Sequence, residues 1–169
     1  MGSANIHQRE QELIDIAFNE LSTVTGLHIL APNIRERLGV FSFYIDNVHH
    51  NLFTSLLNDR FGIQVRGGCS CAGTYGHFLL NVDSKMSKEI TDKIDAGDLS
   101  MKPGWIRLSL HPTMTNEELF FITGAIRQTA EKADDWKEDY CYERHTNEFS
   151  HSRLSEKNDS GYSDWFKLT

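Results

Sequence analysis

The residues best suited to chemistry lie in one short glycine-rich segment, residues 65–77. It holds two cysteines, Cys69 and Cys71, with Arg66 just ahead of them and four glycines around them. Glycine allows left-handed backbone conformations and close approach to a ligand, which a packing loop seldom needs. A thiolate is a strong nucleophile at neutral pH, and nearby positive charge lowers the pKa of a thiol. The segment therefore predicts a reactive loop.

Two other interpretations of the cysteine pair stay open at this point. Cys69 and Cys71 are also compatible with small residues packed under a tight turn, or with thiolate ligands of zinc. A Cys-x-Cys pair supplies only two ligands, and the remaining cysteine, Cys141, stands alone. The short spacing and the odd number of cysteines argue against a disulfide framework. The sequence therefore predicts reduced thiols and no metal site.

A second candidate, Arg107, lies in the alternating apolar segment 105–110. A guanidinium in such a strand is costly unless it faces solvent or has an anionic partner. The planar fork of arginine suits a carboxylate. Both interpretations, a carboxylate anchor and a solvent-facing side chain, are open from the residues alone. The histidines at 49, 50, 77 and 111 are assigned no role.

Hydrophobic periodicity predicts alternating helices and strands around these candidates. The expected helices cover residues 9–21, 52–62, 84–97 and 115–132, and the expected strands cover 26–30, 39–45, 63–65 and 105–110. Ser84 and Ser87 are candidate caps for the third helix, and Thr115 with Glu118 has the spacing of a capping box. The order αββαβαβα predicts an α+β fold, a small sheet covered by helices, over residues 5–133.

Residues 134–169 form a polar run that predicts an extended C-terminal tail. The run contains several aromatic residues, among them Trp136, Tyr140, Tyr142, Phe149, Trp165 and Phe166. Disordered segments are normally poor in aromatic residues, so we expect some of these to dock on a surface.

Composition restricts the class of protein. The chain has 169 residues, of which 39% are hydrophobic and 24% charged, with a formal net charge of −7. This length suits one domain, and no apolar run is long enough for membrane insertion. Without a basic cluster, nucleic acid is an unexpected partner. No export signal is recognised, so we expect a cytoplasmic setting.

Segments 66–72 and 105–112 together resemble the small C-terminal domain of class V aminotransferases, most closely cysteine desulfurases of the selenocysteine-lyase-like branch. The similarity runs from about Arg9 to Lys132 and includes 39–43, 61–66 and 116–118 in the family's order. The resemblance implies the small, mostly antiparallel sheet domain of a fold-type-I pyridoxal-phosphate enzyme.

The desulfurase loop pattern Arg-x-Gly-x-x-Cys-Ala falls on Arg66, Gly68, Cys71 and Ala72. The resemblance implies that Cys71 is the catalytic nucleophile, which takes sulfur from a cysteine substrate as a persulfide while alanine leaves. It also implies that Arg107 binds the substrate carboxylate and that Arg66 lies beside the active site. Molybdenum-cofactor sulfurases carry a cysteine two residues before the reactive one, which suggests Cys69 as a resolving thiol.

The chain departs from the desulfurase pattern at Ser70, where the family usually has histidine. Two alternatives therefore stay open: another class V reaction, such as amino-group transfer or lyase chemistry, and a non-catalytic module that binds a metal or an anion.

The family's Schiff-base lysine and the acid that holds the cofactor belong to its large domain. Neither sequence context occurs in this chain, so the resemblance implies a C-terminal piece of a longer enzyme. Its expected partners are a missing N-terminal domain that binds pyridoxal phosphate, an amino-acid substrate and, in the parent enzyme, a second subunit of a homodimer. We expect no cofactor on this piece and no activity from it alone.

Overall fold

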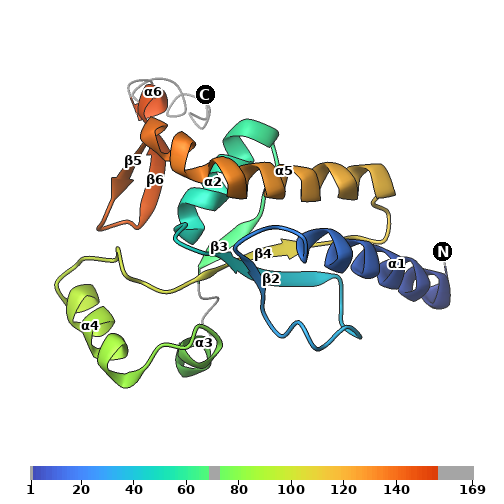
Figure 1. Cartoon of the computed structure of the whole chain (residues 1–169), viewed down its shortest axis with the longest axis horizontal. Helices are drawn as coiled ribbons and strands as arrows, with labels where there is room; N and C mark the ends of the chain where they lie inside the picture. Colours follow the sequence, from blue (N-terminus) through green and yellow to red (C-terminus); the bar gives the residue numbers. More distant parts are fainter. Residues whose placement is uncertain (1, 69–72, 156–169) are drawn as a thin grey trace, which may run out of the picture.

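A four-stranded antiparallel sheet organises the chain, of which a computed structural model describes residues 2–68 and 73–155 (Figure 1). The strand order is β1-β2-β4-β3. The strands are β1 Leu27–Ile29, β2 Val40–Ile45, β3 Arg66–Gly68 and β4 Trp105–Ser109. The expected α+β fold with a small antiparallel sheet is therefore confirmed.

Alternation along β2 and β4 gives the sheet two different faces. Phe41 and Phe43 of β2 and Ile106 of β4 are fully buried. Register pairs Phe41 with Leu108 and Phe43 with Ile106, so these apolar side chains share one face. The opposite face carries the intervening, more polar residues of both strands.

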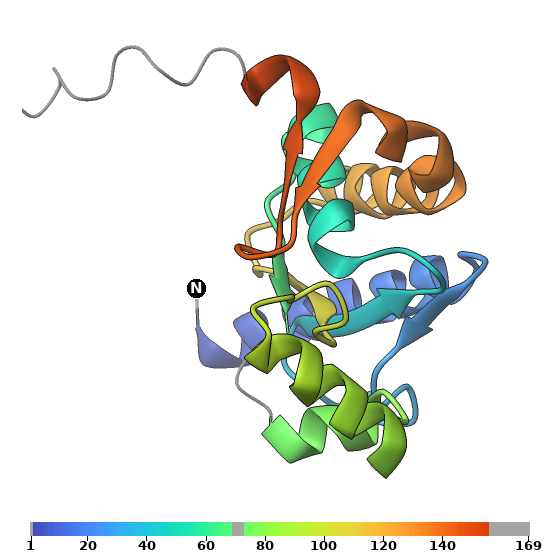
Figure 2. The same ribbon diagram turned by 90° about the vertical axis from the view of Figure 1, so that its left-hand side faces the viewer.

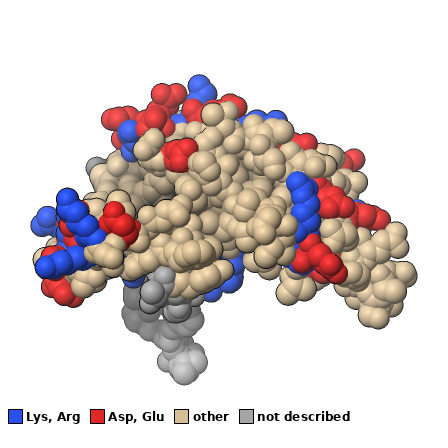
Figure 3. All heavy atoms as spheres, turned by 60° about the horizontal axis from the view of Figure 1, so that its bottom comes forward, with Lys and Arg blue, Asp and Glu red and all other residues tan. Residues whose placement is uncertain are grey.

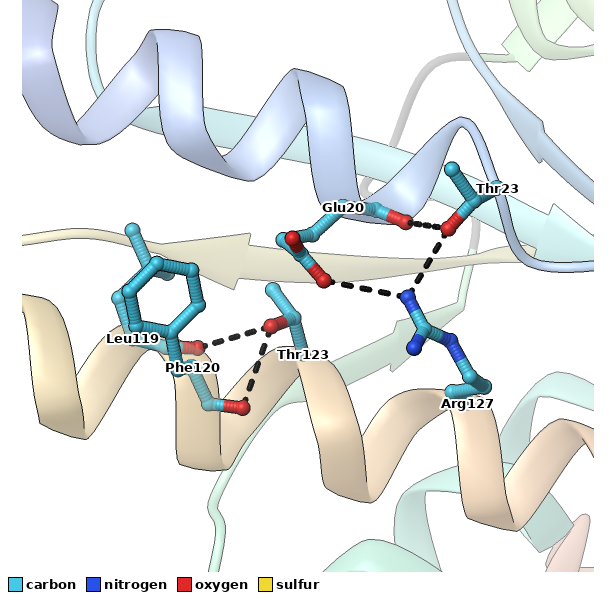
Figure 4. A network of polar contacts seen from close by, with 6 residues as sticks. All are labelled: Glu20, Thr23, Leu119, Phe120, Thr123 and Arg127. Atoms are coloured by element: carbon cyan, nitrogen blue, oxygen red, sulfur yellow. Dashed lines mark hydrogen bonds and ion pairs between the residues drawn. The ribbon is translucent and has the colours of Figure 1, made fainter.

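Three long helices cover the apolar face: α1 Ser3–Leu21, α2 His50–Phe61 and α5 Asn116–Trp136. Helices α3 Gly73–Leu79 and α4 Ser84–Asp95 lie on the other side of the sheet (Figure 1). Polar contacts join α5 to the end of α1 (Figure 4). The Arg127 guanidinium donates to the Glu20 carboxylate at 3.1 Å and to the Thr23 hydroxyl at 2.9 Å.

The helix ends follow local chemistry, with one difference from expectation. Thr115 and Glu118 form the expected capping box at the start of α5. The cap of α4 is Asp83, whose carboxylate accepts from the Met86 amide, so the expected Ser84 and Ser87 caps are wrong. Aspartate and serine are comparable N-cap residues. Because α4 begins at Ser84, the residue before it, Asp83, occupies the N-cap position.

The third strand begins later than expected, at Arg66 instead of residue 63. The reason lies at the end of α2, where Gly62 has a φ of +68°. Its amide donates to the Asn58 carbonyl and the Ile63 amide donates to the Leu57 carbonyl. This Schellman arrangement uses the Ile63 amide for the helix end. Helix α3 was not predicted, because its glycines suggested a loop.

The chain beyond residue 133 is folded where an extended tail was expected. Helix α5 continues to Trp136, followed by the 3₁₀ turn Lys137–Asp139 and then by β5 Tyr140–Glu143, β6 Glu148–His151 and α6 Ser152–Ser155. Strands β5 and β6 form a hairpin. Trp136, Tyr140 and Phe149 pack against the cluster formed by Leu52, Leu56 and Ala133, which confirms docking for these three aromatic residues. Residues 156–169 lie outside the described residues, and the division of the chain at residue 133 stays a prediction.

None of the helices in the two described ranges combines the length and the hydropathy needed to cross a membrane.

Candidate functional site

Strand register brings the two predicted arginines together. Arg66 of β3 is the direct partner of Arg107 of β4, and Arg107 is also the partner of Ser42 of β2. The three residues therefore form a row across three strands. Since Ile106 and Leu108 face the helices, alternation places this row on the opposite face of the sheet. Side chains that are direct cross-strand partners lie about 5 Å apart at Cβ.

This row concentrates positive charge. Within residues 2–68 and 73–155, no carboxylate lies within 4.0 Å of either guanidinium, and neither donates a side-chain hydrogen bond. Arg66 is exposed and Arg107 half-buried. Like charges directly opposite each other in a sheet destabilise it, and two guanidiniums side by side can bind one carboxylate through several hydrogen bonds. The row is therefore suited to an anionic ligand.

The predicted reactive loop joins this row directly. Strand β3 ends at Gly68, whose φ is +113°, and α3 begins at Gly73. The two predicted thiols, Cys69 and Cys71, lie outside the described residues. Their roles stay predictions. In the sequence, the segment that contains them follows β3, which includes Arg66, and precedes α3.

Helix α3 covers part of the open face beside the arginine row. Tyr75 and Leu79 of this helix line a cavity of about 280 Å³ together with Trp105 of β4 and Ser42 of β2. Arg37, in the same cavity, has its guanidinium donating to the carbonyls of Ile34, at 2.7 Å, and of Ala31. Because the Arg37 guanidinium already donates to these carbonyls, Arg37 differs from Arg66 and Arg107, whose guanidiniums have no such partners in the described ranges.

A stacked histidine pair, to which the sequence assigned no role, lies at the start of α2. The rings of His49 and His50 are 4.3 Å apart at an angle of 25°. His50 is only 6% exposed, and a Cβ on Gly104 would lie 2.6 Å from its ring. Burial lowers the pKa of His50 to about 4, and the charges of His49 and Lys102 act in the same direction. Burial also lowers the pKa of His49.

Ser42 and His50 had no usable signal in the sequence. Ser42 becomes part of the arginine row only through strand register, and His50 becomes buried only because Gly104, far along the chain, packs on its ring. Both features depend on contacts between distant segments, which local patterns do not encode.

The described residues do not fit pyridoxal phosphate. The lysines at 85, 88, 93, 102, 132 and 137 are all solvent-exposed. A Schiff-base lysine requires a desolvated amine, because an ammonium in water keeps its proton at neutral pH. For the same ranges, no group of three or more His, Cys, Asp and Glu side chains is placed to hold a metal ion.

Comparisons with known proteins point to one enzyme family. The family model described as Aminotransferase class-V matches residues 1–120. A probable cysteine desulfurase of Staphylococcus aureus is 37% identical over 132 residues, which are 78% of this chain and 26% of the relative. A probable cysteine desulfurase of Staphylococcus epidermidis is 37% identical over 73 residues, 43% of this chain and 17% of the relative.

Among solved structures, the apo structure of a cysteine desulfurase from Thermococcus onnurineus NA1 is similar, with a TM-score of 0.52 and 21% sequence identity. The similarity covers 76% of this chain and 26% of that chain. At this identity it concerns the fold. The chain thus spans about a quarter or less of the length of the relatives that it matches.

Proposed function

Because this chain belongs to the class V aminotransferase family, we propose that it is the small C-terminal domain of a cysteine desulfurase that depends on pyridoxal phosphate. The observation that carries the proposal is the arginine row, in which Arg107 and Arg66 lie side by side next to the cysteine loop. The cofactor would be held by a separate N-terminal domain, since the described residues do not fit it.

In the proposed reaction, Arg107 binds the carboxylate of L-cysteine and Arg66 supports it. Cys71 receives the substrate sulfur: its sulfur forms an S–S bond while the substrate C–S bond breaks. Alanine leaves with a proton on its β-carbon, and Cys71 becomes a persulfide. No external oxidant is required, because the carbon is reduced as the two sulfurs become bonded. Exposure of Arg66 and partial exposure of Arg107 leave the row accessible to a small amino acid.

The face that carries the row is also proposed to contact the missing domain. Large apolar side chains are exposed on this side of the molecule: Phe78 is 76% exposed, Leu38 73% and Tyr75 61%. Figure 3 shows a largely uncharged band across this side, with charged side chains gathered toward its ends. An exposed apolar patch commonly marks an interface. By the same family resemblance, we propose a homodimeric parent enzyme in the cytoplasm.

The test uses the parent enzyme, loaded with pyridoxal phosphate and incubated with L-cysteine. We expect release of alanine and a persulfide on Cys71, mapped by peptide mass spectrometry. Cys71→Ala should abolish alanine release, whereas Cys141→Ala, which removes an exposed thiol of β5, should leave it unchanged.

Two results would separate the alternatives. Turnover of another amino acid with full activity in Cys71→Ala would assign a transaminase or lyase reaction, with Cys71 a bystander. Stoichiometric zinc in the purified protein without turnover would favour a non-catalytic binding module.

The Cys69 hypothesis has its own test. A thiol at Cys69 could attack a Cys71 persulfide, forming a Cys69–Cys71 disulfide and releasing hydrogen sulfide. Cys69→Ser should then slow sulfur release without preventing persulfide formation. Unchanged release kinetics would remove this role.

A further inference from the structure

A groove runs along α2, between the edge of the main sheet and the C-terminal hairpin. It consists of two adjoining cavities of about 650 Å³ and 490 Å³, which share four lining residues, Thr54, Ser55, Phe149 and Ser150. Figure 2 shows the hairpin standing beside α2 and β3. The α2 residues that line the groove extend from His50 to Asp59. Nine helical steps make about 14 Å, the length of about four residues of extended chain.

Each wall of the groove contains a strand, β3 on one side and β6 on the other, together with the two residues that precede that strand. Consecutive residues line it on each side, 64–68 on one wall and 146–151 on the other. Neighbouring residues of a strand point to opposite faces, so an uninterrupted series means that the strand edge borders the groove. Strand β3 is the last strand of the sheet and, among the described strands, pairs only with β4. Its outer edge presents backbone groups that pair readily with an added strand.

The two walls differ in how their backbone groups are used. On the β6 side, the Asn51 side-chain amide donates to the Asn147 carbonyl at 2.5 Å, and the Ser55 hydroxyl donates to the Phe149 carbonyl at 3.3 Å. These contacts hold the hairpin on α2. On the β3 side, a Cβ on Gly67 would lie 2.7–3.4 Å from side-chain atoms of Asn51, Thr54 and His50, so α2 packs closely on one face of β3, whereas a Cβ on Gly68 would meet no described residue within 4 Å. Within the described residues, no strand pairs with the outer edge of β3. An added strand would therefore pair with β3.

Charge distinguishes one end of the groove. Arg66 and Lys102 both line the larger cavity, and within the described ranges neither has a carboxylate within 4.0 Å. Glu148, on the β6 wall, is the carboxylate of that cavity. His50 lines it as well, and its ring makes no hydrogen bond to any described residue. At the other end, the Asp59 carboxylate accepts from the Tyr140 hydroxyl at 2.7 Å. Positive charge therefore prevails at the His50 end.

We infer that this groove binds an extended peptide segment of another polypeptide, about four residues long, which adds to the outer edge of β3. An acidic side chain of the segment lies beside Lys102 at the His50 end. Main-chain hydrogen bonds supply affinity, and the charged end sets the direction of the segment. The inference does not rest on the proposed sulfur chemistry, although Arg66 lines the groove and also belongs to the arginine row.

The test uses the 169-residue chain and a positional-scanning library of fluorescent, acetylated and amidated hexapeptides, read by polarisation. We expect a preference for Asp or Glu at one position. In NMR spectra, the best peptide should shift the amide signals of 64–68 and 146–151. Lys102→Glu should weaken its binding by about 10-fold, a typical effect for a charge-assisted contact. Lys85→Glu, an exposed charge change on α4, is the matched control and should have no effect.

A second arm tests the backbone pairing. A version of the best peptide that is methylated at alternate backbone nitrogens should bind at least about 10-fold more weakly, because it cannot pair with a strand. The inference is overturned if no peptide binds with a Kd below about 1 mM. It is also overturned if methylation or Lys102→Glu leaves the affinity unchanged. If inorganic sulfate shifts all the same amide signals as the peptide, the groove is a site for small anions and the peptide inference is wrong.

Discussion

Arg107 and Arg66 are direct cross-strand partners with no carboxylate beside them in the described ranges. A pair of like charges in this position serves a ligand at the expense of the fold. The residues that bind an anion should therefore be slightly unfavourable for the stability of the isolated chain. Substitution of Arg107 should therefore increase stability and weaken substrate binding, whereas substitution of a merely structural arginine should not increase stability.

We predict that Arg107→Gln stabilises the 169-residue chain by about 0.2–1 kcal/mol, because it removes the repulsion from Arg66. In the parent enzyme the same change should raise KM for L-cysteine by about 10-fold or more, since a charge-assisted contact is lost. Urea unfolding and steady-state kinetics measure the two effects. Arg127→Gln is the control: it loses the Glu20 ion pair, so stability should fall by up to about 1 kcal/mol while KM is unchanged. A destabilising Arg107→Gln would contradict an anion-binding role.

Two glycines allow a second prediction at this scale. A Cβ at Gly104 would lie 2.6–2.8 Å from three atoms of the buried His50 ring, whereas a Cβ at Gly124 on α5 would meet nothing within 4 Å. We expect Gly104→Ala to destabilise the chain by about 1–3 kcal/mol through overpacking. Gly124→Ala should stabilise it by up to about 1 kcal/mol, because alanine is favoured inside a helix. Urea denaturation distinguishes them, and equal effects would refute the close packing of His50 on Gly104.

At the scale of elements, α5 links the sheet domain to the hairpin. Its first turn is fixed by the capping box of Thr115 and Glu118, and its last turns place Ala133 and Trp136 against α2. The hairpin that follows is held on α2 by Asn51 and Ser55. The groove beside β3 therefore depends on the position of α5. The start of this helix is set by its capping box, and its end is set by packing against α2.

We predict that Thr115→Ala lowers the free energy of unfolding by about 1 kcal/mol, the usual contribution of an N-cap side chain. The Glu118 amide loses its acceptor at 3.1 Å, and Glu118 is left to cap alone. Thr91→Ala on α4 is the matched control, because its hydroxyl only bonds the Ser87 carbonyl within an exposed helix. Its effect should stay within about 0.5 kcal/mol. Guanidinium titrations compare the variants, and equal losses would argue against the cap.

In the molecule as a whole, the stacked pair of half-buried His49 and buried His50 links the start of α2 to the loop before β4 and to the C-terminal hairpin. His50 packs on Gly104 ahead of β4, and His49 contacts Tyr142 and Phe149 of the hairpin. Lys102 contributes positive charge from the loop between α4 and β4. Protonation of this pair therefore acts on α2, on the loop before β4 and on the hairpin together.

We predict that stability falls as pH drops from about 6.5 to 4. His50 has a pKa of about 4 in the folded chain, whereas an imidazole in the unfolded chain titrates near 6.5. Between these values the unfolded chain binds a proton that the folded chain does not, so the free energy of unfolding decreases by about 3 kcal/mol. Urea unfolding at several pH values measures this slope.

The comparison of variants isolates the contribution of His50. His50→Gln should flatten the slope whatever its effect on stability at pH 8, and His7→Gln, an exposed change on α1, should leave the slope as it is. The assignment fails if His50→Gln retains the full dependence on pH.

Most elements of the sheet domain and all the candidate residues could be predicted from the amino-acid sequence. Apolar periodicity placed the long helices, alternation placed β2 and β4, and the capping box at Thr115 marked the start of α5. These signals are local, since hydrogen-bonding and hydrophobic preferences act within one turn or one strand. The same local reasoning placed the third strand too early and gave the chain after residue 133 no folded structure.

The common row of Arg66, Arg107 and Ser42 and the burial of His50 beside Gly104 could be seen only in the folded chain. The folded chain also shows that the polar residues after 139 pair as a hairpin against α2 and so form the groove. Register and burial depend on pairings between segments that are distant in the chain. Such pairings are selected by the packing of the whole core, which no single segment encodes.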